Sequence, residues 1–285
     1  NLSEIRTARA RKFVQGGCCG LNELLKFEAF LMNEYDRILV LDADSLIIRN
    51  IDHLFERSVR LGLSLVYTGD PAMAAKNAAA LPAQGGFLLI APNVTIREEL
   101  LEIIREGNFR GGGGWRDSRI GWGYGGATVQ GLLAYYYKRV APPSLSAMLD
   151  FCRYNRMLTH RFNCSGVAID EVFSTHFTVC QKPWTCRPVA STMCHELHAV
   201  WWDVRSSLER SCGLEPHPRC VDRLGRIRRR PYARLLPRLI QASPSPLASS
   251  GQLTSKWSNQ TTAWPKSRCL RQARPHASPG GLPTS

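Results

Sequence analysis

The chain has 285 residues, 44% of them hydrophobic, and a formal charge of +14 at pH 7. It is long enough to bury a full core, and one α/β domain with extensions is the simplest organisation. Because no stretch of about 18 consecutive apolar residues occurs, the sequence predicts no membrane span. Much of the positive charge follows Arg205 without a nucleic-acid-binding motif, so we expect no nucleic-acid partner.

Composition divides the chain into four segments. Residues 1–20 are basic and rich in Gly and Cys, and residues 21–210 are expected to form the folded domain. Residues 211–240 form a basic extension, and 241–285 a Ser/Pro-rich tail that we expect to be disordered. Since a basic extension attracts anionic surfaces, binding of anionic polymers is one candidate function.

The ten cysteines lack the Cys-x-x-Cys spacing of zinc sites. Four glycosylation sequons also occur, at Asn1, Asn93, Asn163 and Asn259. Disulfides and N-glycans both form in the secretory pathway. These features favour the secretory pathway, and the Golgi lumen in particular, although a cytoplasmic location stays open.

The first predicted elements are a helix, a strand and a second helix. Asn22 can cap a helix whose apolar residues recur at helical spacing: Leu24, Leu25, Phe27, Phe30 and Leu31. The short run Ile38–Leu41 is apolar throughout, which is typical of a buried parallel strand. A short helix is predicted to begin near Asp52, and Leu63–Tyr67 is a second predicted strand.

The middle of the chain adds a strand and an amphipathic helix. Residues 72–80 are rich in Ala and fit either a helix or a mobile loop. Phe87–Ala91 is a third predicted strand, entered through Gln84-Gly85-Gly86, and Thr95 can cap the helix that follows. The buried stripe of that helix is predicted to be Ile96, Leu100, Leu101, Ile103 and Ile104.

Residues 111–126 form a Gly-rich stretch that also contains Trp115 and Trp122. Its aromatic rings fit either stacking faces for sugars or anchors in the core, and both interpretations stay open. A helix over 129–137, a strand and loop over 176–184 and a helix over 197–208 complete the order. This order predicts an α/β fold with a mostly parallel central sheet.

Asp42 and Asp44 follow the Ile38–Leu41 strand directly, with only Ala43 between them. Ligands of open α/β sheets bind beyond the carboxyl ends of strands. Two carboxylates one residue apart can turn onto one hard cation such as Mn²⁺ or Mg²⁺. The pair therefore predicts a divalent-metal site that could hold a diphosphate, while capping of a turn is the simpler alternative.

In combination, several motifs between about residues 20 and 205 resemble glycosyltransferase family 8, which contains glycogenin. The similarity is carried by an ordered set: Leu25-Lys26-Phe27, Tyr35 to Asp44 followed by Asn50-Ile-Asp-His-Leu-Phe55, Gln84 to Pro92, Gln130-Gly-Leu-Leu133, and His176 to Lys182-Pro-Trp184. The resemblance implies a nucleotide-diphospho-sugar transferase (GT-A) fold. It also implies a UDP-sugar donor, Mn²⁺ as cofactor with Mg²⁺ as an alternative, and retention of anomeric configuration. The acceptor would be a glycan, a glycoprotein or a polyol.

The resemblance also implies roles for individual residues. Asp42, Asp44 and His176 would hold the metal. Lys26, Ala43 and Lys182 would contact the donor, the two lysines placing positive charge on its diphosphate. Gln84, Gly85 and Gly86 would line the sugar pocket. Gln130 would act at the donor sugar as the catalytic residue, although a buried polar contact is an equal alternative.

This chain departs from the family pattern in ways that bear on activity. Val129 stands where the family has an Asp, Gln84-Gly85-Gly86 replaces an Asn-Ser/Thr-Gly motif, and the glycine after the His is Val179 or Cys180 here. Residues 1–20 leave almost no room for the uridine-binding strands, so we expect part of them to be absent. A catalytically degenerate relative that binds nucleotide or carbohydrate, or acts as a scaffold, is therefore the alternative to an active transferase.

Overall fold

The computed structural model describes residues 20–70, 81–123, 125–157, 164–189, 191–216 and 220. The chain divides into two compact units, each described by itself. The first contains the described residues up to Lys182 together with Val189–Leu197, and the second contains Pro183–Pro188 and the described residues from His198 onward. All candidate site residues lie in the first unit. The predicted boundaries at residues 20, 210 and 240 stay predictions.

The strands of the first unit form a four-stranded sheet and two small ladders. The four-stranded sheet has the order β1-β4-β3-β7, with β1 Ile38–Leu41, β3 Leu65–Gly69, β4 Ala83–Ile90 and β7 Ser146–Leu149. The small ladders are β2 Ser45–Ile47 with β8 Ser174–His176, and β5 Phe109–Arg110 with β6 Gly114–Trp115.

Helices account for most of the remaining described elements. The α-helices are α2 Asp52–Arg60, α3 Val94–Glu106, α4 Val129–Tyr135 and α5 Thr192–Ser211, and a π-helical segment, Tyr136–Val140, continues α4. The 3₁₀ segments are Gly20–Leu31, Gly111–Gly113, Pro143–Leu145, Ile169–Glu171 and Pro183–Thr185. Among the described helices, none combines the length and apolar character needed to cross a bilayer.

The predicted α/β class is confirmed, but the prediction that the strands of the sheet are mostly parallel is wrong. In the four-stranded sheet β4 runs antiparallel to both β1 and β3, and only β3 and β7 are parallel. The predicted full burial of Ile38–Leu41 is also wrong, since β1 lies at the edge of the four-stranded sheet and all four residues are only partly buried. An apolar run reads the same in a parallel and in an antiparallel strand. The pairing was therefore not readable from these runs.

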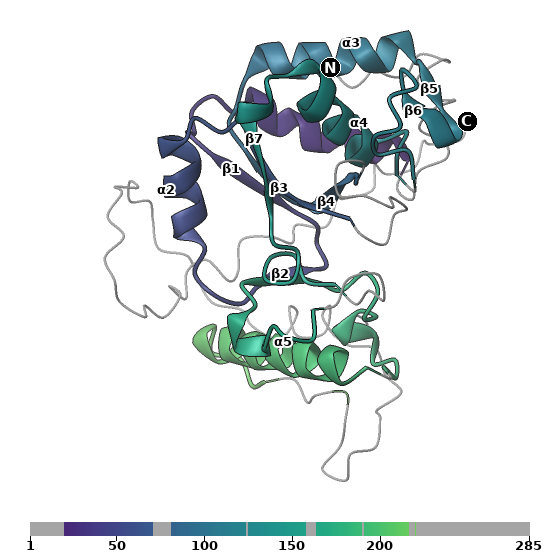
Figure 1. Cartoon of the computed structure of the whole chain (residues 1–285). Helices are drawn as coiled ribbons and strands as arrows, with labels where there is room; N and C mark the ends of the chain where they lie inside the picture. Colours follow the sequence, from purple (N-terminus) through teal and green to yellow (C-terminus); the bar gives the residue numbers. More distant parts are fainter. Residues whose placement is uncertain are drawn as a thin grey trace, which may run out of the picture. The chain divides into compact units, whose positions relative to one another are not determined.

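Helices cover both faces of the sheet, and β4 separates two clusters of the core (Figure 1). Leu88 and Ile90 pack in a cluster with the 3₁₀ helix Gly20–Leu31, α3 and α4. Phe87 and Leu89 face the other way, with Leu54 of α2. Successive strand residues point to opposite faces, so the all-apolar end of β4 reflects burial on both sides.

The first helix is a 3₁₀ helix, which changes the buried face from the one predicted. With three residues per turn, positions 24, 27 and 30 align, and Leu24, Phe27 and Phe30 are at most 1% exposed. Leu25 is 50% exposed and Leu31 38% exposed, so these two members of the apolar set lie outside the core.

Other predicted boundaries shift by a few residues. Asn93, not Thr95, caps α3, because its side chain accepts a hydrogen bond from the Ile96 amide at 3.2 Å. The predicted buried stripe of α3 is confirmed. Strand β4 begins at Ala83, so Gln84–Gly86 lie within the strand, and the helix predicted over 197–208 begins at Thr192.

In the Gly-rich stretch, the described residues are ordered around Trp115. Trp115 is 1% exposed, and its Nε1 donates to the Gly126 carbonyl at 2.8 Å. This residue is therefore a core anchor, as the structural alternative predicted, while Trp122 is half-buried. The Ala-rich prediction over 72–80 and the predicted tail over 241–285 lie outside the described residues.

Candidate metal and diphosphate site

Strand β1 delivers the two acids to the edge of the sheet. Leu41 pairs with Phe87 in the β1–β4 ladder, and the next amide, that of Asp42, donates to the Gly86 carbonyl at 3.3 Å. A turn closes there, because the Ser45 amide donates to the Asp42 carbonyl at 2.9 Å. Asp42 and Asp44 therefore leave the buried sheet at a fixed point, beside Gly86. Ala43 lies exposed in the turn between them.

A second ladder brings His176 to the same point from far along the sequence. In the β2–β8 ladder Ser45 pairs with His176, and the Phe177 amide donates to the Asp44 carbonyl at 2.8 Å. His176 is 4% exposed. Backbone pairing at residues 176 and 177 thus holds the imidazole opposite the two acids.

Together these three side chains form a set with the chemistry of a metal site. His176 Nε2 lies 3.1 Å from Asp44 Oδ1 and 3.7 Å from Asp42 Oδ2. One ligand atom from each residue can be chosen so that all lie within 4.8 Å of one another. Two carboxylates and one imidazole suit Mn²⁺, and carboxylates also suit Mg²⁺. The residues present therefore fit the predicted metal.

Electrostatics favour the neutral, metal-binding form of the imidazole. Burial lowers the pKa of His176, the Asp42 carboxylate opposes this shift, and the nearby Lys26 adds to it. A neutral imidazole offers a lone pair to a cation. His176 Nδ1 is buried without a hydrogen-bond partner, so the described polar contacts of the ring are on the Nε2 side.

Each carboxylate of the set is paired with one of the predicted donor-binding lysines. Lys26 Nζ lies 2.6 Å from Asp42 Oδ1 and donates to the Gly85 carbonyl at 2.9 Å. Lys182 Nζ pairs with Asp44 Oδ2. Burial lowers the pKa of Lys182, and Asp42 opposes this shift. Two cationic groups thus stand beside the candidate metal site, where a diphosphate bound to the metal would meet them.

Backbone close to the imidazole requires glycine. A Cβ atom on Gly86 would lie 2.6 Å from both Cε1 and Nδ1 of His176, and 2.9 Å from Gln84 Oε1. Gln84 Oε1 accepts from the Gly86 amide at 2.5 Å. The predicted sugar-pocket segment therefore touches the metal set directly.

Gln130 reaches this segment from the first turn of α4. It is 4% exposed, and its Oε1 accepts from the Gly85 amide at 2.9 Å. This contact orients the Gly85 backbone, as the buried-polar alternative for Gln130 predicts, and its catalytic role stays a prediction. Val129 is fully buried in the core beside it, so the position of the family's Asp is apolar here.

Asn155 contacts the same segment, although no sequence motif pointed to it. It is 1% exposed, and its Nδ2 donates at 3.0 Å to both Gln84 Oε1 and Thr68 Oγ1. Its backbone has a φ of 54°, in the left-handed region that Asn tolerates better than most residues. The only signal in the sequence was an Asn in a segment without regular structure, and such residues are too common to indicate a functional position.

Comparisons with known proteins give partial similarities. No model of a known protein family matches the chain. Over 166 residues the chain is 25% identical to the uncharacterized protein R707 of Acanthamoeba polyphaga mimivirus, covering 56% of this chain and 53% of that protein. Over 198 residues it is 24% identical to the putative UDP-glucuronate:xylan alpha-glucuronosyltransferase 3 of Arabidopsis thaliana, covering 64% of this chain and 27% of that protein. The chain thus spans about half the length of the first relative and about a quarter of the second.

Two solved structures are also similar. Mouse xyloside xylosyltransferase 1, in its apo form, has a TM-score of 0.43 at 15% identity, with 64% of this chain and 73% of that chain covered. The glycosyltransferase GlyE of Streptococcus pneumoniae TIGR4 has a TM-score of 0.40 at 17% identity, with 63% and 41% covered.

Proposed function

We propose that this chain is a metal-dependent, retaining glycosyltransferase of the GT-A fold, similar to family 8, that transfers a sugar from a UDP-sugar to an acceptor hydroxyl. The observation that carries the proposal is the meeting of Asp42, Asp44 and His176, with a lysine beside each carboxylate. The name of the Arabidopsis relative agrees with a UDP-sugar donor. A glycan, a glycoprotein or a polyol would be the acceptor.

In this proposal Asp42, Asp44 and His176 hold Mn²⁺ or Mg²⁺, which supplies Lewis-acid stabilisation of the departing diphosphate. Lys26 and Lys182 bind the diphosphate oxygens and neutralise the charge that develops on them. Ala43 contributes backbone at the turn between the acids. Gln84, Gly85, Gly86 and Gln130 orient the donor sugar.

The identity of residue 129 bears on the route of transfer. A double displacement needs a side-chain nucleophile beside the anomeric carbon. Val129 has no nucleophilic atom and is fully buried, so this position offers none. Attack by the acceptor hydroxyl on the face that UDP leaves is therefore the proposed route to retention.

Release of UDP from a panel of UDP-sugars tests this function. With the whole 285-residue chain and Mn²⁺, we expect release from at least one donor, loss of release with a chelator, and a decrease of about a hundredfold or more for Asp44→Asn. Asp36→Asn, an exposed acid just before the same strand, is the matched control and should retain activity. Release that survives both the chelator and Asp44→Asn would contradict the proposal.

A catalytically degenerate nucleotide- or carbohydrate-binding protein is the second candidate, and buried Val129 favours it because a donor-contacting carboxylate is absent there. Calorimetry with UDP and Mn²⁺ separates the two. Tight binding of both without sugar transfer or UDP release would favour the second candidate.

We also infer that the protein resides in an oxidising compartment such as the Golgi lumen. Disulfides link Cys152 to Cys164, Cys180 to Cys194, and Cys186 to Cys220. Such bonds persist in secretory compartments and are reduced in the cytosol.

A further inference from the structure

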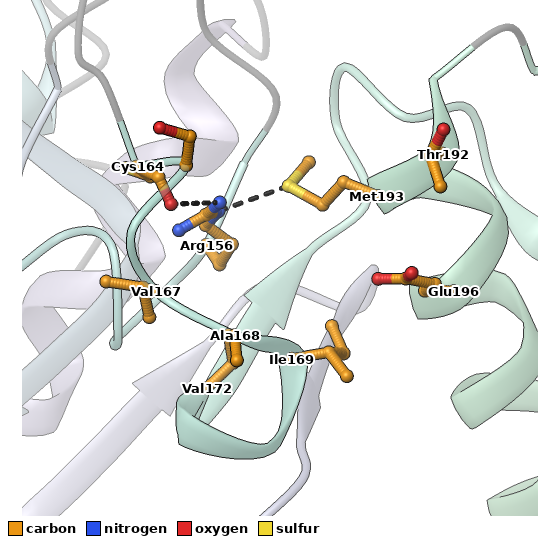
Figure 2. A pocket seen from close by; sticks show the side chains of 10 residues that line it. Arg156, Cys164, Val167, Ala168, Ile169, Val172, Thr192, Met193 and Glu196 are labelled. Carbon is orange, nitrogen blue, oxygen red and sulfur yellow. Dashed lines mark hydrogen bonds between the residues drawn. The ribbon is translucent and has the colours of Figure 1, made fainter.

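A pocket of about 280 Å³ lies within the first unit, and none of the metal-site side chains lines it (Figure 2). One wall comes from the segment between Cys164 and Val172, and the other from the first turns of α5, which carry Thr192, Met193 and Glu196. Arg156 lies between the two walls. None of these residues has a role in the function proposed above.

The guanidinium of Arg156 is buried and, among the described residues, contacts no carboxylate directly. Arg156 is 7% exposed, its Nη1 donates to the Cys152 carbonyl at 3.0 Å and its Nη2 to the Cys164 carbonyl at 3.1 Å. Within the described residues it forms no ion pair. Burial also lowers its pKa, and the Asp150 carboxylate opposes this shift. A buried charge in this state is an anchor for an anion.

The third contact of the guanidinium is the one most easily exchanged. Arg156 Nε points at Met193 Sδ, 3.1 Å away on the opposite wall (Figure 2). A thioether is a weak acceptor, and the methionine side chain is flexible. A ligand oxygen that replaced this sulfur would gain a charge-assisted hydrogen bond, and a planar carboxylate matches the guanidinium fork.

The remaining lining sets the size and charge of the ligand. Val167, Ile169 and Val172 give an apolar surface, and Ser165 and Thr192 carry hydroxyl groups. Glu196 is exposed and lines the pocket, so the pocket carries one positive and one negative charge. This balance suits a monoanion with hydroxyl groups better than a phosphate dianion.

Both walls are covalently fixed. Cys152–Cys164 closes a loop around Arg156, and Cys180–Cys194 ties the start of α5 to the segment after His176. Because the walls are held before any ligand arrives, binding does not have to order them.

We propose that this pocket binds a carboxylate-bearing ligand about the size of one sugar unit, anchored by the fork of Arg156. An acidic monosaccharide has the required carboxylate, hydroxyl groups and volume. The proposed binding requires neither metal nor nucleotide, so it can be tested whether or not the transferase proposal holds.

The probe is glucuronate, titrated by calorimetry or ligand-observed NMR into the whole oxidised chain with a chelator present. Glucose is its neutral counterpart, and inorganic phosphate, with all titrations at about pH 8.5 where it is almost entirely HPO4²⁻, is the dianionic one. We expect glucuronate to bind at least about tenfold more tightly than either, because only it offers a monoanionic fork to Arg156. Equal binding of glucose, or tighter binding of phosphate, would overturn the proposal.

Two substitutions locate the binding. Arg156→Met should weaken glucuronate binding about tenfold or more, and near-ultraviolet circular dichroism reports whether it folds. Glu196→Gln is on an exposed helical position and removes a like charge, so it should tighten glucuronate about twofold to fivefold while leaving glucose unchanged. If Glu196→Gln leaves the affinity for glucuronate unchanged, the ligand binds elsewhere and the assignment is overturned.

Discussion

At the scale of single residues, the two acids of the candidate metal site are already neutralised by lysines. Lys26 pairs with Asp42 and Lys182 with Asp44. A divalent cation must compete with both lysines for the carboxylates, whereas a diphosphate would attract the lysines away. Metal and nucleotide should therefore each promote binding of the other, as linkage requires.

Lys182→Gln tests this competition. The substitution frees Asp44 from a cation, so Mn²⁺ alone should bind about threefold to tenfold more tightly than to the wild type, while UDP in the presence of Mn²⁺ should bind more weakly. Calorimetry of each ligand, with and without the other, measures both effects. Arg139→Gln, an exposed basic residue on the segment after α4, is the control and should change neither. Weaker binding of Mn²⁺ alone to Lys182→Gln would show that the lysine does not compete.

Gly86→Ala tests the close contact between backbone and imidazole. The new Cβ would lie 2.6 Å from Nδ1 and Cε1 of the His176 ring, so the ring must leave its present position relative to the acids. We expect Mn²⁺ affinity to fall about tenfold or more, as measured by calorimetry. Gly112→Ala is the matched control, because nothing lies within 4 Å of its added Cβ and its φ is not positive. Equal Mn²⁺ affinity of the two variants would mean that the ring position does not matter.

The grouping of Asp42, Asp44 and His176 was predictable because the signal of each is local. Asp42 and Asp44 end an apolar strand, and His176 stands six residues before Lys182-Pro-Trp184 in a recognisable motif. Asn155 was not predictable, because its importance comes from hydrogen bonds to Thr68 and Gln84, which only the fold brings near. The pairing of Lys182 with Asp44 is likewise a property of the folded chain.

At the scale of elements, helical period decides which residues of the first helix are buried. The sequence suggested an α-helix, and a 3.6-residue period would place Leu24, Leu25 and Phe27 near one face. The observed 3₁₀ period selects every third residue instead. Sequence patterns identify such an element, but neighbouring packing decides its period.

Leu24 and Leu25 provide a matched pair to test this assignment. Leu24 is 1% exposed and Leu25 is 50% exposed. Leu24→Ala should lower the free energy of unfolding by about 2–5 kcal/mol, and Leu25→Ala by less than about 1 kcal/mol. Urea unfolding followed by circular dichroism measures both. Similar losses for the two variants would contradict the 3₁₀ arrangement.

The start of α3 carries an exposed sequon whose asparagine also caps the helix. Asn93 accepts through Oδ1, which leaves Nδ2 available for a glycan. After expression through a eukaryotic secretory pathway, we expect the wild type to carry one more N-glycan than Asn93→Asp, measured as a mobility shift on enzymatic deglycosylation. The Asp variant keeps a good capping acceptor, so its folding is preserved. Identical glycan content in the two proteins would contradict the prediction.

At the scale of the whole molecule, local patterns gave the class of the fold but not its connectivity. Apolar runs located β1, β3 and β4, and amphipathic spacing located α3. The antiparallel direction of β4 depends on how the chain returns between strands, and the ladder of β2 with β8 joins residues 45 and 176. Long-range pairing of this kind leaves no periodic trace in the sequence.

The pH dependence of stability should reflect one buried lysine. Burial lowers the pKa of Lys138 from 10.5 to about 8. Between these values the unfolded chain binds more protons than the folded one, so the free energy of unfolding should rise with pH from about 8 to 10. Because the side chain is only partly buried, solvent screening reduces the effect and the rise should be about 1–2 kcal/mol.

Above pH 10 the slope should reverse, because burial raises the pKa of Tyr67 from 10.0 to about 12 and its contribution is lost as pH rises through that range. Urea unfolding of the oxidised protein at several pH values from 7 to 11 measures the curve. Lys138→Met should abolish the rise between pH 8 and 10 and keep the fall above pH 10, because it removes the group that the folded state holds with a lowered pKa. Arg139→Met, on the exposed neighbour, should follow the wild-type curve. If the curves of Lys138→Met and the wild type run parallel from pH 8 to 10, Lys138 is not the group that titrates.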